Sequence, residues 1–353
     1  MTENEIYAIL SGVKYPGFSR SVVELGFVQR VAIEGDRIVV DLEIPASSAE
    51  IARALREDTA RALTAAGHKN AVLNIAQPQA QTSSRGKNLA PHIKRFVMIS
   101  SGKGGVGKST AAVNLAVAAA MRGKQVGLLD ADVYGPNVPR MLGLENARLD
   151  TRADKVTPPL AYGVKAMSMG MILEPSQALI WRGPMIMKAI EQFFTDVAWG
   201  ELDALFMDMP PGTGDAQLSL AQCVPVSAGI VVTTPQSVAL DDAKRGLDMF
   251  VKMRIPIAGI VENMNGFICP NCHTEHDIFG KGACEALARE YGTEMLAQIP
   301  IEPAIRKGGD SGRPIIYDQP SSETAKRYLI AADRLWTFLE RSEGDNAGIQ
   351  PVN

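Results

Sequence analysis

One glycine-rich stretch, residues 100–110, constrains this chain more than any other. It reads Ser-Ser-Gly-Lys-Gly-Gly-Val-Gly-Lys-Ser-Thr, follows the apolar run Phe96–Ile99 and precedes an alanine-rich run over 111–120. Strand, glycine-rich turn and helix in that order form the context that a phosphate-binding loop requires. Glycines let successive backbone N–H groups converge on one anion, because side chains there would block the approach. The stretch therefore predicts a nucleotide-binding chain.

Residue types within this loop indicate separate roles. Lys108 is expected to reach the β- and γ-phosphates, and Ser109 is placed to hold Mg²⁺. The other loop residues are expected to line the nucleotide: Gly102, Lys103, Gly104, Gly105, Val106, Gly107 and Thr110. The alternative is a glycine-rich turn that fits the pattern by chance.

Acidic residues follow two apolar runs further along the chain. Asp130 and Asp132 end the run Gln125–Leu129, and their spacing lets both face one crevice. One carboxylate can support the Mg²⁺ shell while the other orients a water molecule for attack on the γ-phosphate. Asp208 closes the run Ala204–Met207, the position from which a carboxylate holds Mg²⁺ through water. For the Asp130 motif, an ordinary solvated turn is the alternative.

The segment after Asp208 reads Met-Pro-Pro-Gly-Thr-Gly-Asp and combines stiff prolines with permissive glycines. The Gly212 N–H is expected to contact the γ-phosphate and to release it after hydrolysis, which would move the following helix. We therefore interpret the segment as a switch loop, with a plain loop as the alternative.

Asn263 ends another apolar strand, at the rim where a base would lie. Its amide both donates and accepts hydrogen bonds, which suits an adenine edge. Asparagine also commonly starts turns, so the residue by itself leaves both interpretations open.

Cys269 and Cys272 are separated by two residues, a spacing that lets both thiolates face one metal. One such pair supplies two ligands, whereas a zinc or iron–sulfur site needs four. A two-fold dimer with the pairs facing each other would supply the rest. Two alternatives stay open: a zinc site within one chain that adds His273 and His276, and a redox dithiol.

Strands and helices alternate from Arg95 onward, which predicts a doubly wound, mostly parallel α/β sheet with helices on both faces. Short and almost continuously apolar runs are the expected strands: Phe96–Ile99, Gln125–Leu129, Ala204–Met207, Gly229–Thr233, Ile257–Val261 and Met295–Ile299. Ligands in such sheets bind at the carboxyl ends of the strands, where the motifs above fall.

Residues 1–76 predict a small α/β domain ahead of this sheet. Its expected elements are helices over Glu3–Leu10 and 47–67 and strands over 28–33, 37–44 and 72–75. Residues 77–94 are polar and interpreted as a linker. The large domain is expected over 95–342, followed by a disordered tail over 343–353.

Composition narrows the class of protein. The 353 residues suffice for two domains, and the net charge of −3 gives no reason to expect a nucleic-acid partner. No apolar run approaches the roughly 18 residues of a membrane span, so we expect no membrane partner. The acidic start differs from a secretory signal and predicts a cytoplasmic protein with reduced thiols. Cys223 and Cys284 stand alone in apolar segments and are expected to be buried.

Taken together, these motifs resemble a known family. Lys103 gives the loop a second lysine, as in the deviant phosphate-loop ATPases that include MinD, the partition ATPases and the nitrogenase iron protein. Three further segments narrow the likeness to the Mrp/ApbC branch, the iron–sulfur cluster carriers: residues 130–139, 208–215, and 261–264 leading to the cysteine pair. Residues 181–185, Trp-Arg-Gly-Pro-Met, add a signature to which we assign no role. The likeness runs from about Arg95 to Leu339.

This resemblance implies an ATP-binding and ATP-hydrolysing homodimer that bridges a labile [4Fe-4S] cluster between its two cysteine pairs. The cluster would come from an assembly scaffold and pass to apoproteins. Lys103 would reach across the dimer to the partner's phosphates, Asp132 would align the attacking water, and Asn263 would contact adenine. Asp130 would then join Ser109 and Asp208 around Mg²⁺, and hydrolysis would be slow.

Residues 1–76 are similar to the MIP18-type domain often fused ahead of such ATPases, chiefly through residues 23–28 and the following hairpin. Two positions depart from that pattern. Tyr15-Pro16 replaces the usual Asp-Pro, and Ser47-Ser48 stands where many members carry Cys-Pro. A docking role is therefore expected for this domain rather than a cluster-binding thiol.

Two other functions are compatible with the motifs. A positioning ATPase that cycles on a membrane or DNA needs a basic amphipathic helix or a basic surface, and residues 341–353 offer neither. A structural zinc protein with a vestigial ATPase differs in the metal that it retains.

Overall fold

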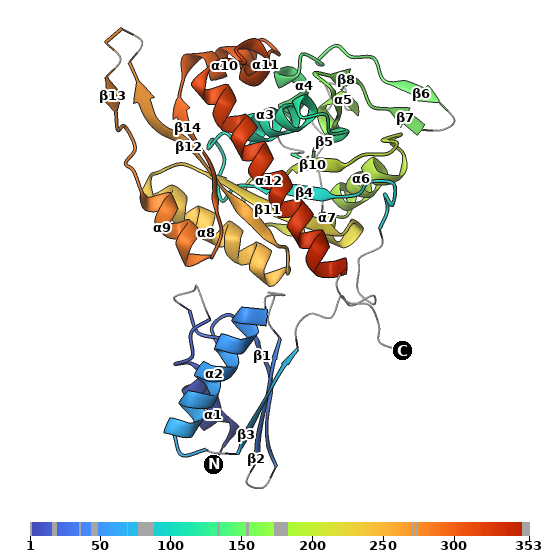
Figure 1. The fold of residues 1–353 in the computed structure, drawn as a ribbon. Coiled ribbons are helices and arrows are strands. Elements are labelled where there is room, and N and C mark those ends of the chain that lie inside the picture. Colours follow the sequence, from blue (N-terminus) through green and yellow to red (C-terminus); the bar gives the residue numbers. More distant parts are fainter. Residues whose placement is uncertain are drawn as a thin grey trace. The chain divides into compact units, whose positions relative to one another are not determined.

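The computed structural model describes residues 2–15, 20–34, 37–43, 49–68, 70–76, 88–132, 135–152, 155–172, 183–269, 271–272 and 274–347. The chain divides into two compact units, one mainly of residues 1–84 and the other mainly of residues 85–344 (Figure 1). Residues 88–94, expected in the linker, already belong to the larger unit. The Leu89 N–H donates to the carbonyl of Cys223, and the Lys94 N–H donates to that of Leu202.

The smaller unit packs two helices on a three-stranded sheet. Its elements are α1 (Glu3–Leu10), β1 (Val28–Glu34), β2 (Arg37–Glu43), α2 (Ala49–Ala65) and β3 (Ala71–Ala76). The hairpin of β1 and β2 is antiparallel, and β3 returns parallel to β2 after the α2 crossover. The side chains of Ile6, Leu42 and Leu55 are fully buried and fill the space between helices and sheet. Positions 47–48, where the domain departs from the family pattern, lie outside the described residues.

The larger unit is built on a mostly parallel sheet. Its strands are β4 (Phe96–Ser100), β5 (Val126–Asp130), β8 (Leu160–Ala161), β9 (Val164–Ser168), β10 (Ala204–Asp208), β11 (Val226–Thr233), β12 (Ile257–Ile268), β13 (Glu275–His276) and β14 (Met295–Ile301). In the described residues they lie in the order β13-β12-β11-β4-β10-β5-β9-β8, and β14 also pairs with β12. Only β8 and β13 run antiparallel to their neighbours. A separate ribbon pairs β6 (Asp150–Arg152) with β7 (Lys155–Thr157).

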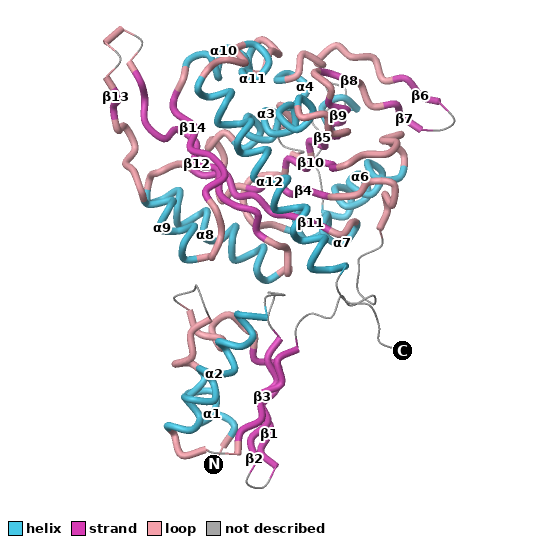
Figure 2. Tube along the Cα trace, in the orientation of Figure 1, coloured by secondary structure: helices cyan, strands magenta, loops and turns pink. Residues whose placement is uncertain are grey.

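Helices cover both faces of this sheet (Figure 2). They are α3 (Lys108–Met121), α4 (Val138–Met141), α5 (Met169–Ile172), α6 (Gly183–Thr195), α7 (Asp215–Cys223), α8 (Ser237–Lys252), α9 (Ala283–Glu290), α10 (Pro303–Asp310), α11 (Ile315–Asp318) and α12 (Glu323–Ala347). On one face α3 and α12 share an apolar core with the strands. On the other, Phe194 of α6 meets Phe96 edge to face, with the ring centroids 6.1 Å apart. This is the doubly wound architecture that the sequence predicts.

Several features differ from the sequence prediction, and two of them have a clear physical reason. Strand β9 pairs parallel with β5 but was not expected, because its sequence Val-Lys-Ala-Met-Ser is short and interrupted by a lysine. Helix α12 continues to Ala347, so residues 343–347 are helical rather than part of a disordered tail. A helix adds residues at little cost once it is nucleated, so α12 can continue past the end that the sequence predicts. None of the described helices is both long and apolar enough to cross a bilayer.

Packing of α12 offers a direct test of this core. Leu335 is fully buried in the core that α12 shares with α3, whereas Ile330 on the same helix is 49% exposed. We expect Leu335→Ala to lower the free energy of unfolding by about 2 to 5 kcal/mol, because it leaves a cavity. Ile330→Ala should change it by less than about 0.5 kcal/mol. Urea unfolding followed by tryptophan fluorescence measures both; equal losses would contradict the packing described.

Candidate functional site

The sequence motifs meet at one edge of the large sheet because three strands end there side by side. Strand β10 lies between β4 and β5, and its last residue, Asp208, pairs with Ile99 on one side and with Asp130 on the other. The glycine-rich loop leaves β4 immediately beyond this point. Sheet order, rather than sequence proximity, therefore brings the loop and both acidic motifs together.

Backbone conformation in the loop explains two of its glycines. Gly107 has φ +85°, and a Cβ added there would lie 2.1 Å from Asn263 Nδ2. Gly102 passes so close to α8 that a Cβ would lie 2.1 Å from the backbone of Asp242. The loop is thus held between α8 and Asn263 in the middle of β12, and it leads directly into α3, which begins at Lys108. A helix that starts at such a loop presents free N–H groups to an anion.

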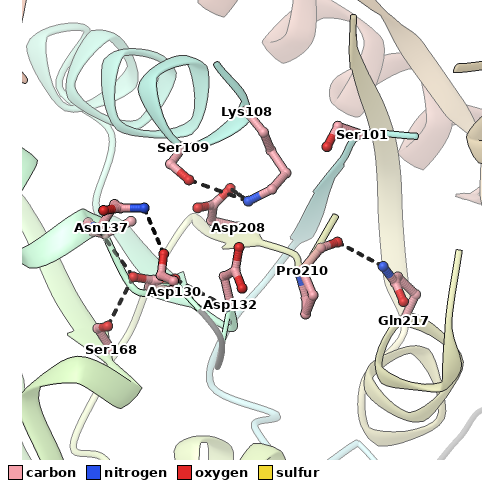
Figure 3. Close-up of polar contacts among 12 residues, drawn as sticks. Ser101, Lys108, Ser109, Asp130, Asp132, Asn137, Ser168, Asp208, Pro210 and Gln217 are labelled. Atoms are coloured by element: carbon pink, nitrogen blue, oxygen red, sulfur yellow. Dashed lines mark hydrogen bonds and ion pairs between the residues drawn. The ribbon is translucent and has the colours of Figure 1, made fainter. Parts of the chain in front are cut away.

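Lys108 forms a buried ion pair with Asp208. Its Nζ lies 2.6 Å from Asp208 Oδ1 and 3.4 Å from Ser109 Oγ, and the side chains are 6% and 0% exposed (Figure 3). Burial raises the pKa of Asp208, against the lowering effect of Lys108. Among the described residues, Asp208 Oδ2 has no hydrogen-bond partner. A buried carboxylate oxygen without a partner, close to a serine hydroxyl, fits the oxygen ligands that Mg²⁺ prefers.

Asp130 organises the loop that follows β5. Its Oδ1 accepts a hydrogen bond from the Asp132 N–H at 3.1 Å, and its Oδ2 accepts from the Val138 N–H at 3.2 Å and from Ser168 Oγ at 3.0 Å. Burial raises the pKa of Asp130 to about 7, and the nearby Asp208 carboxylate adds to the rise. The sequence did not indicate this structural role. The expected place of Asp130 around Mg²⁺ stays a prediction.

A cavity of about 190 Å³ lies over the loop. Lys108, Ser109 and Asp132 line it, together with Gly104 and Pro211. Figure 3 shows the Asp208 carboxylate beside the Lys108 ammonium group, with Asp132 below it and Asp130 on the side of Ser168. Asp132 is the member of its motif that reaches the cavity wall, the position needed to orient a water molecule at a phosphate.

Gln217 holds the switch loop in place, a role that the sequence analysis missed. Its Nε2 donates to the carbonyls of Pro210 and Gly212, each at 2.9 Å, and its Oε1 accepts from the Gly214 N–H at 3.0 Å. The Gly212 N–H, expected at the γ-phosphate, donates to the Ser101 carbonyl at 2.8 Å. The sequence does contain a sign of this role: a glutamine at the third position of a helix, here α7, often hydrogen-bonds back to the residue that caps the helix start.

A second cavity, of about 480 Å³, adjoins the phosphate cavity and shares Gly105, Gly107 and Thr110 with it. Asn263 lines this second cavity, and its Nδ2 donates to the Val106 carbonyl at 2.9 Å. The cavity is large enough for a base and lies at the end of the loop where a nucleoside would extend. Base recognition by Asn263 stays a prediction, and Asn263 lies on the wall of the cavity where a base would fit.

Cys269 and Cys272 lie at the turn between β12 and β13. Cys269 is partly exposed and Cys272 is exposed. The Cys269 N–H donates to the Thr274 carbonyl at 3.0 Å, and Cys272 Sγ lies 3.3 Å from Thr274 Oγ1. Hydrogen bonds with the side chain and backbone of Thr274 lower the pKa of Cys272. Both thiols therefore reach the surface, and one of them is biased toward the thiolate that binds metal.

The other histidine and cysteine candidates behave differently. Cys223 and Cys284 are buried, as expected. His276 lies on β13 beside Phe267, with the ring centroids 6.4 Å apart, and His273 is outside the described residues. The part of the chain that the structure describes contains no group of three or more potential metal ligands. Residues 181 and 182 of the tryptophan motif also lie outside it.

Comparison with known proteins identifies the family. The family model described as the NUBPL iron-transfer P-loop NTPase matches residues 92–336. The chain belongs to this family. A second model, described as an iron–sulfur cluster assembly protein, matches residues 3–73. The resemblance inferred from the motifs is thereby confirmed, and the chain is a P-loop NTPase.

Relatives extend over almost the whole chain. The iron–sulfur cluster carrier protein of Helicobacter pylori is 51% identical over 361 residues, covering 100% of this chain and 98% of the relative. That of Escherichia coli K12 is 41% identical, covering 92% and 89%. Among solved structures, the nucleotide-binding protein in complex with ADP from Archaeoglobus fulgidus has a TM-score of 0.59 at 37% identity, covering 67% and 92%. The cell division ATPase MinD of Pyrococcus furiosus, at 24% identity and a TM-score of 0.54, shares the fold.

The raised pKa of Asp130 gives this NTPase a testable pH dependence. Because the pKa is about 7 in the folded state and near 3.8 when unfolded, the folded protein takes up this proton as the pH falls from 8 to 6. Asp130 therefore destabilises the fold most at pH 8, where it is charged, and least at pH 6. The Ser168 hydroxyl favours the charged form, so its removal should matter most at pH 8.

We expect Ser168→Ala to lower the free energy of unfolding by about 2 kcal/mol at pH 8 and by about 1 kcal/mol or less at pH 6. Denaturant titrations of nucleotide-free protein at both pH values measure this. Ser227→Ala is the control, since Ser227 Oγ accepts from a neutral backbone group, the Phe96 N–H. A Ser168→Ala loss that is constant with pH would contradict the role given to Asp130.

Proposed function

We propose that this NTPase is an ATP-dependent iron–sulfur cluster carrier of the cytoplasm. One observation carries the proposal: two neighbouring thiols stand at the exposed turn of a hairpin, and the strand that leads into that hairpin also lines the nucleotide cavity. The family and the names of the relatives point to the same activity. The cargo is an iron–sulfur cluster, which the chain would bind and pass to apoproteins after receiving it from an assembly scaffold.

Cluster binding requires a second copy of the chain. Each chain offers two thiols at the hairpin turn, and a [4Fe-4S] cluster takes four. A two-fold homodimer that brings the two turns together completes the set, and exposed thiolates suit a cluster that must leave again. Among the described residues, no hydrogen bond or ion pair is formed by the Lys103 side chain, which leaves its ammonium group available to the partner's phosphates.

Hydrolysis is proposed to begin with exchange of partners at Lys108. ATP phosphates entering the cavity would draw the lysine from Asp208, whose carboxylate then turns to Mg²⁺ together with Ser109. The metal, when bound, would neutralise charge on the phosphates. Asp132 would orient the attacking water, and the Gly212 N–H would leave the Ser101 carbonyl to bind the γ-phosphate. Gln217 ties that exchange to α7, which passes the nucleotide state to the rest of the chain.

The first test addresses hydrolysis. We expect Lys108→Ala and Asp208→Asn each to lower kcat for ATP hydrolysis by at least about 100-fold, since each removes a charge from the phosphate site. Asp203→Asn is the matched control, because Asp203 forms a 2.8 Å ion pair with Lys94 just before the start of β10. A phosphate-release assay measures turnover, and unfolding curves check each fold. Unchanged turnover in either site variant would remove that residue from the mechanism.

The second test addresses the cargo. We expect Cys269→Ala and Cys272→Ala each to abolish the cluster while leaving ATP binding unchanged, because the thiols lie outside the nucleotide cavity. Cys223→Ala, at a buried cysteine, is the control and should retain the cluster. Anaerobic reconstitution followed by absorbance spectroscopy and iron and sulfide analysis measures loading. Retained iron in both hairpin variants would refute the bridging site, and zinc in place of iron would favour a structural metal.

The smaller unit is proposed to dock partners. It matches a cluster-assembly domain model but carries no cysteine, so its contribution is recognition of a scaffold or client rather than ligation.

A further inference from the structure

The second cavity, of about 480 Å³, is called the nucleoside cavity below. The hairpin of β12 and β13, with Cys269 and Cys272 at its turn, is called the cysteine hairpin, and both of its ends contribute to the wall of this cavity. Asn263 and Met264 line it from β12, the strand that leads into the turn. Phe279 lines it from the segment that follows β13, three residues after the hairpin ends. Both chain segments that connect the thiols to the sheet therefore contact the space expected to hold the base.

An irregular stretch of backbone separates these cavity residues from the thiols. Strand β12 pairs with β14 at Asn263 opposite Ile299 and again at Phe267 opposite Ile301. Three residues, 264–266, thus face one residue of β14, which makes a bulge of two extra residues. Met264 has φ +60° and Gly266 has φ +73°. A methionine in the left-handed region is uncommon, and such conformations persist where the surroundings determine them.

Buried polar contacts fix the base of this bulge. The Asn265 amide donates to Glu262 Oε2 at 2.6 Å, and the Gln298 amide of β14 donates to the same oxygen at 2.8 Å. Glu262 is fully buried and immediately precedes Asn263. The root of the hairpin is thus anchored on the sheet, while the Met264 and Phe279 side chains face the cavity.

We propose that Met264 and Phe279 are positioning residues through which a bound adenine base holds the cysteine hairpin. Phe279 is partly exposed and places an aromatic residue on the wall of a base-sized cavity, an arrangement suited to stacking. A base bound between these residues links the two ends of the hairpin. Nucleotide occupancy and the behaviour of the thiols are then coupled, and the coupling acts in both directions. The inference rests on the nucleotide site of the proposed function but not on cluster binding.

The test measures alkylation of Cys269 and Cys272 in the reduced, cluster-free, full-length chain, with and without saturating MgADP. N-ethylmaleimide is the reagent, and mass spectrometry separates the hairpin thiols from buried Cys223 and Cys284. We expect MgADP to slow alkylation of the hairpin thiols by about fivefold. In Phe279→Ala the rate without nucleotide should stay within about twofold of wild type, and the MgADP effect should vanish even at saturation.

Variants distinguish positioning from simple packing. Ile278→Ala is the matched control, since Ile278 is adjacent, 51% exposed and absent from the cavity wall; it should keep the full MgADP effect. Phe279→Leu keeps the apolar bulk but loses the ring, and should retain less than half of that effect. Met264→Gly suits the positive φ and should also weaken it.

Binding of a fluorescent ADP analogue, measured in parallel, separates the outcomes. If the wild-type chain binds the analogue but its alkylation rates do not respond to MgADP, the inference is overturned and the carrier function stands. Full MgADP dependence in Phe279→Ala likewise overturns it. If the wild-type chain binds no nucleotide, the proposed function fails as well.

Discussion

The buried pairing of Lys108 with Asp208 is the interaction on which the rest of the nucleotide site depends. Two charges taken out of water cost several kcal/mol each, and their attraction offsets this only when both stay satisfied. Here Asp208 keeps one oxygen without a partner among the described residues, so the pair is stable enough to fold yet incomplete. When a nucleotide binds, Lys108 would pair with a phosphate and Asp208 with a cation. Two ion pairs would then replace the one between Lys108 and Asp208. The Lys108–Asp208 pair is therefore suited to exchange partners when a nucleotide and its cation bind.

Sequence reasoning indicated candidate residues whose expected roles follow from their own chemistry, and those roles stay predictions. The glycine-rich loop, Asp208 and the exposed cysteine pair were readable because each follows from residue type and a short spacing. Residues that act by holding others were not. Ser168 supports Asp130 across 38 positions, and nothing in either local sequence announces the contact. Gln217 and Phe279 serve segments whose paths only the folded sheet defines, so their roles become visible after β10 and β12 are placed.

The same distinction explains the fold. The apolar strands at the centre were predicted because burial on both faces demands continuous hydrophobic runs. The edge strands β8 and β13 were not, since an edge needs fewer apolar residues. Neither was β9, which lies between β5 and β8 and is interrupted by Lys165. Residues 343–347 extend a helix whose earlier turns are anchored in the core at Leu335 and Leu339, and their polar sequence did not indicate a helix. Central strands can be predicted from their apolar sequence pattern, whereas edge strands and helix ends depend on the elements that pack beside them.

Continuity of β12 sets a limit on how this chain can link its two activities. Asn263 and the cysteines belong to one strand and its turn, and the residues between Asn263 and Phe267 connect the thiols to the part of the strand that lines the cavity. That segment already holds the extra residues and positive φ values of a bulge, while Glu262 anchors the strand just before it. This irregular backbone thus begins at Met264, a residue that lines the nucleoside cavity. Coupling between a bound nucleotide and the thiols therefore need not pass through the hydrophobic core, because the cavity adjoins the residues where the cysteine hairpin leaves the sheet.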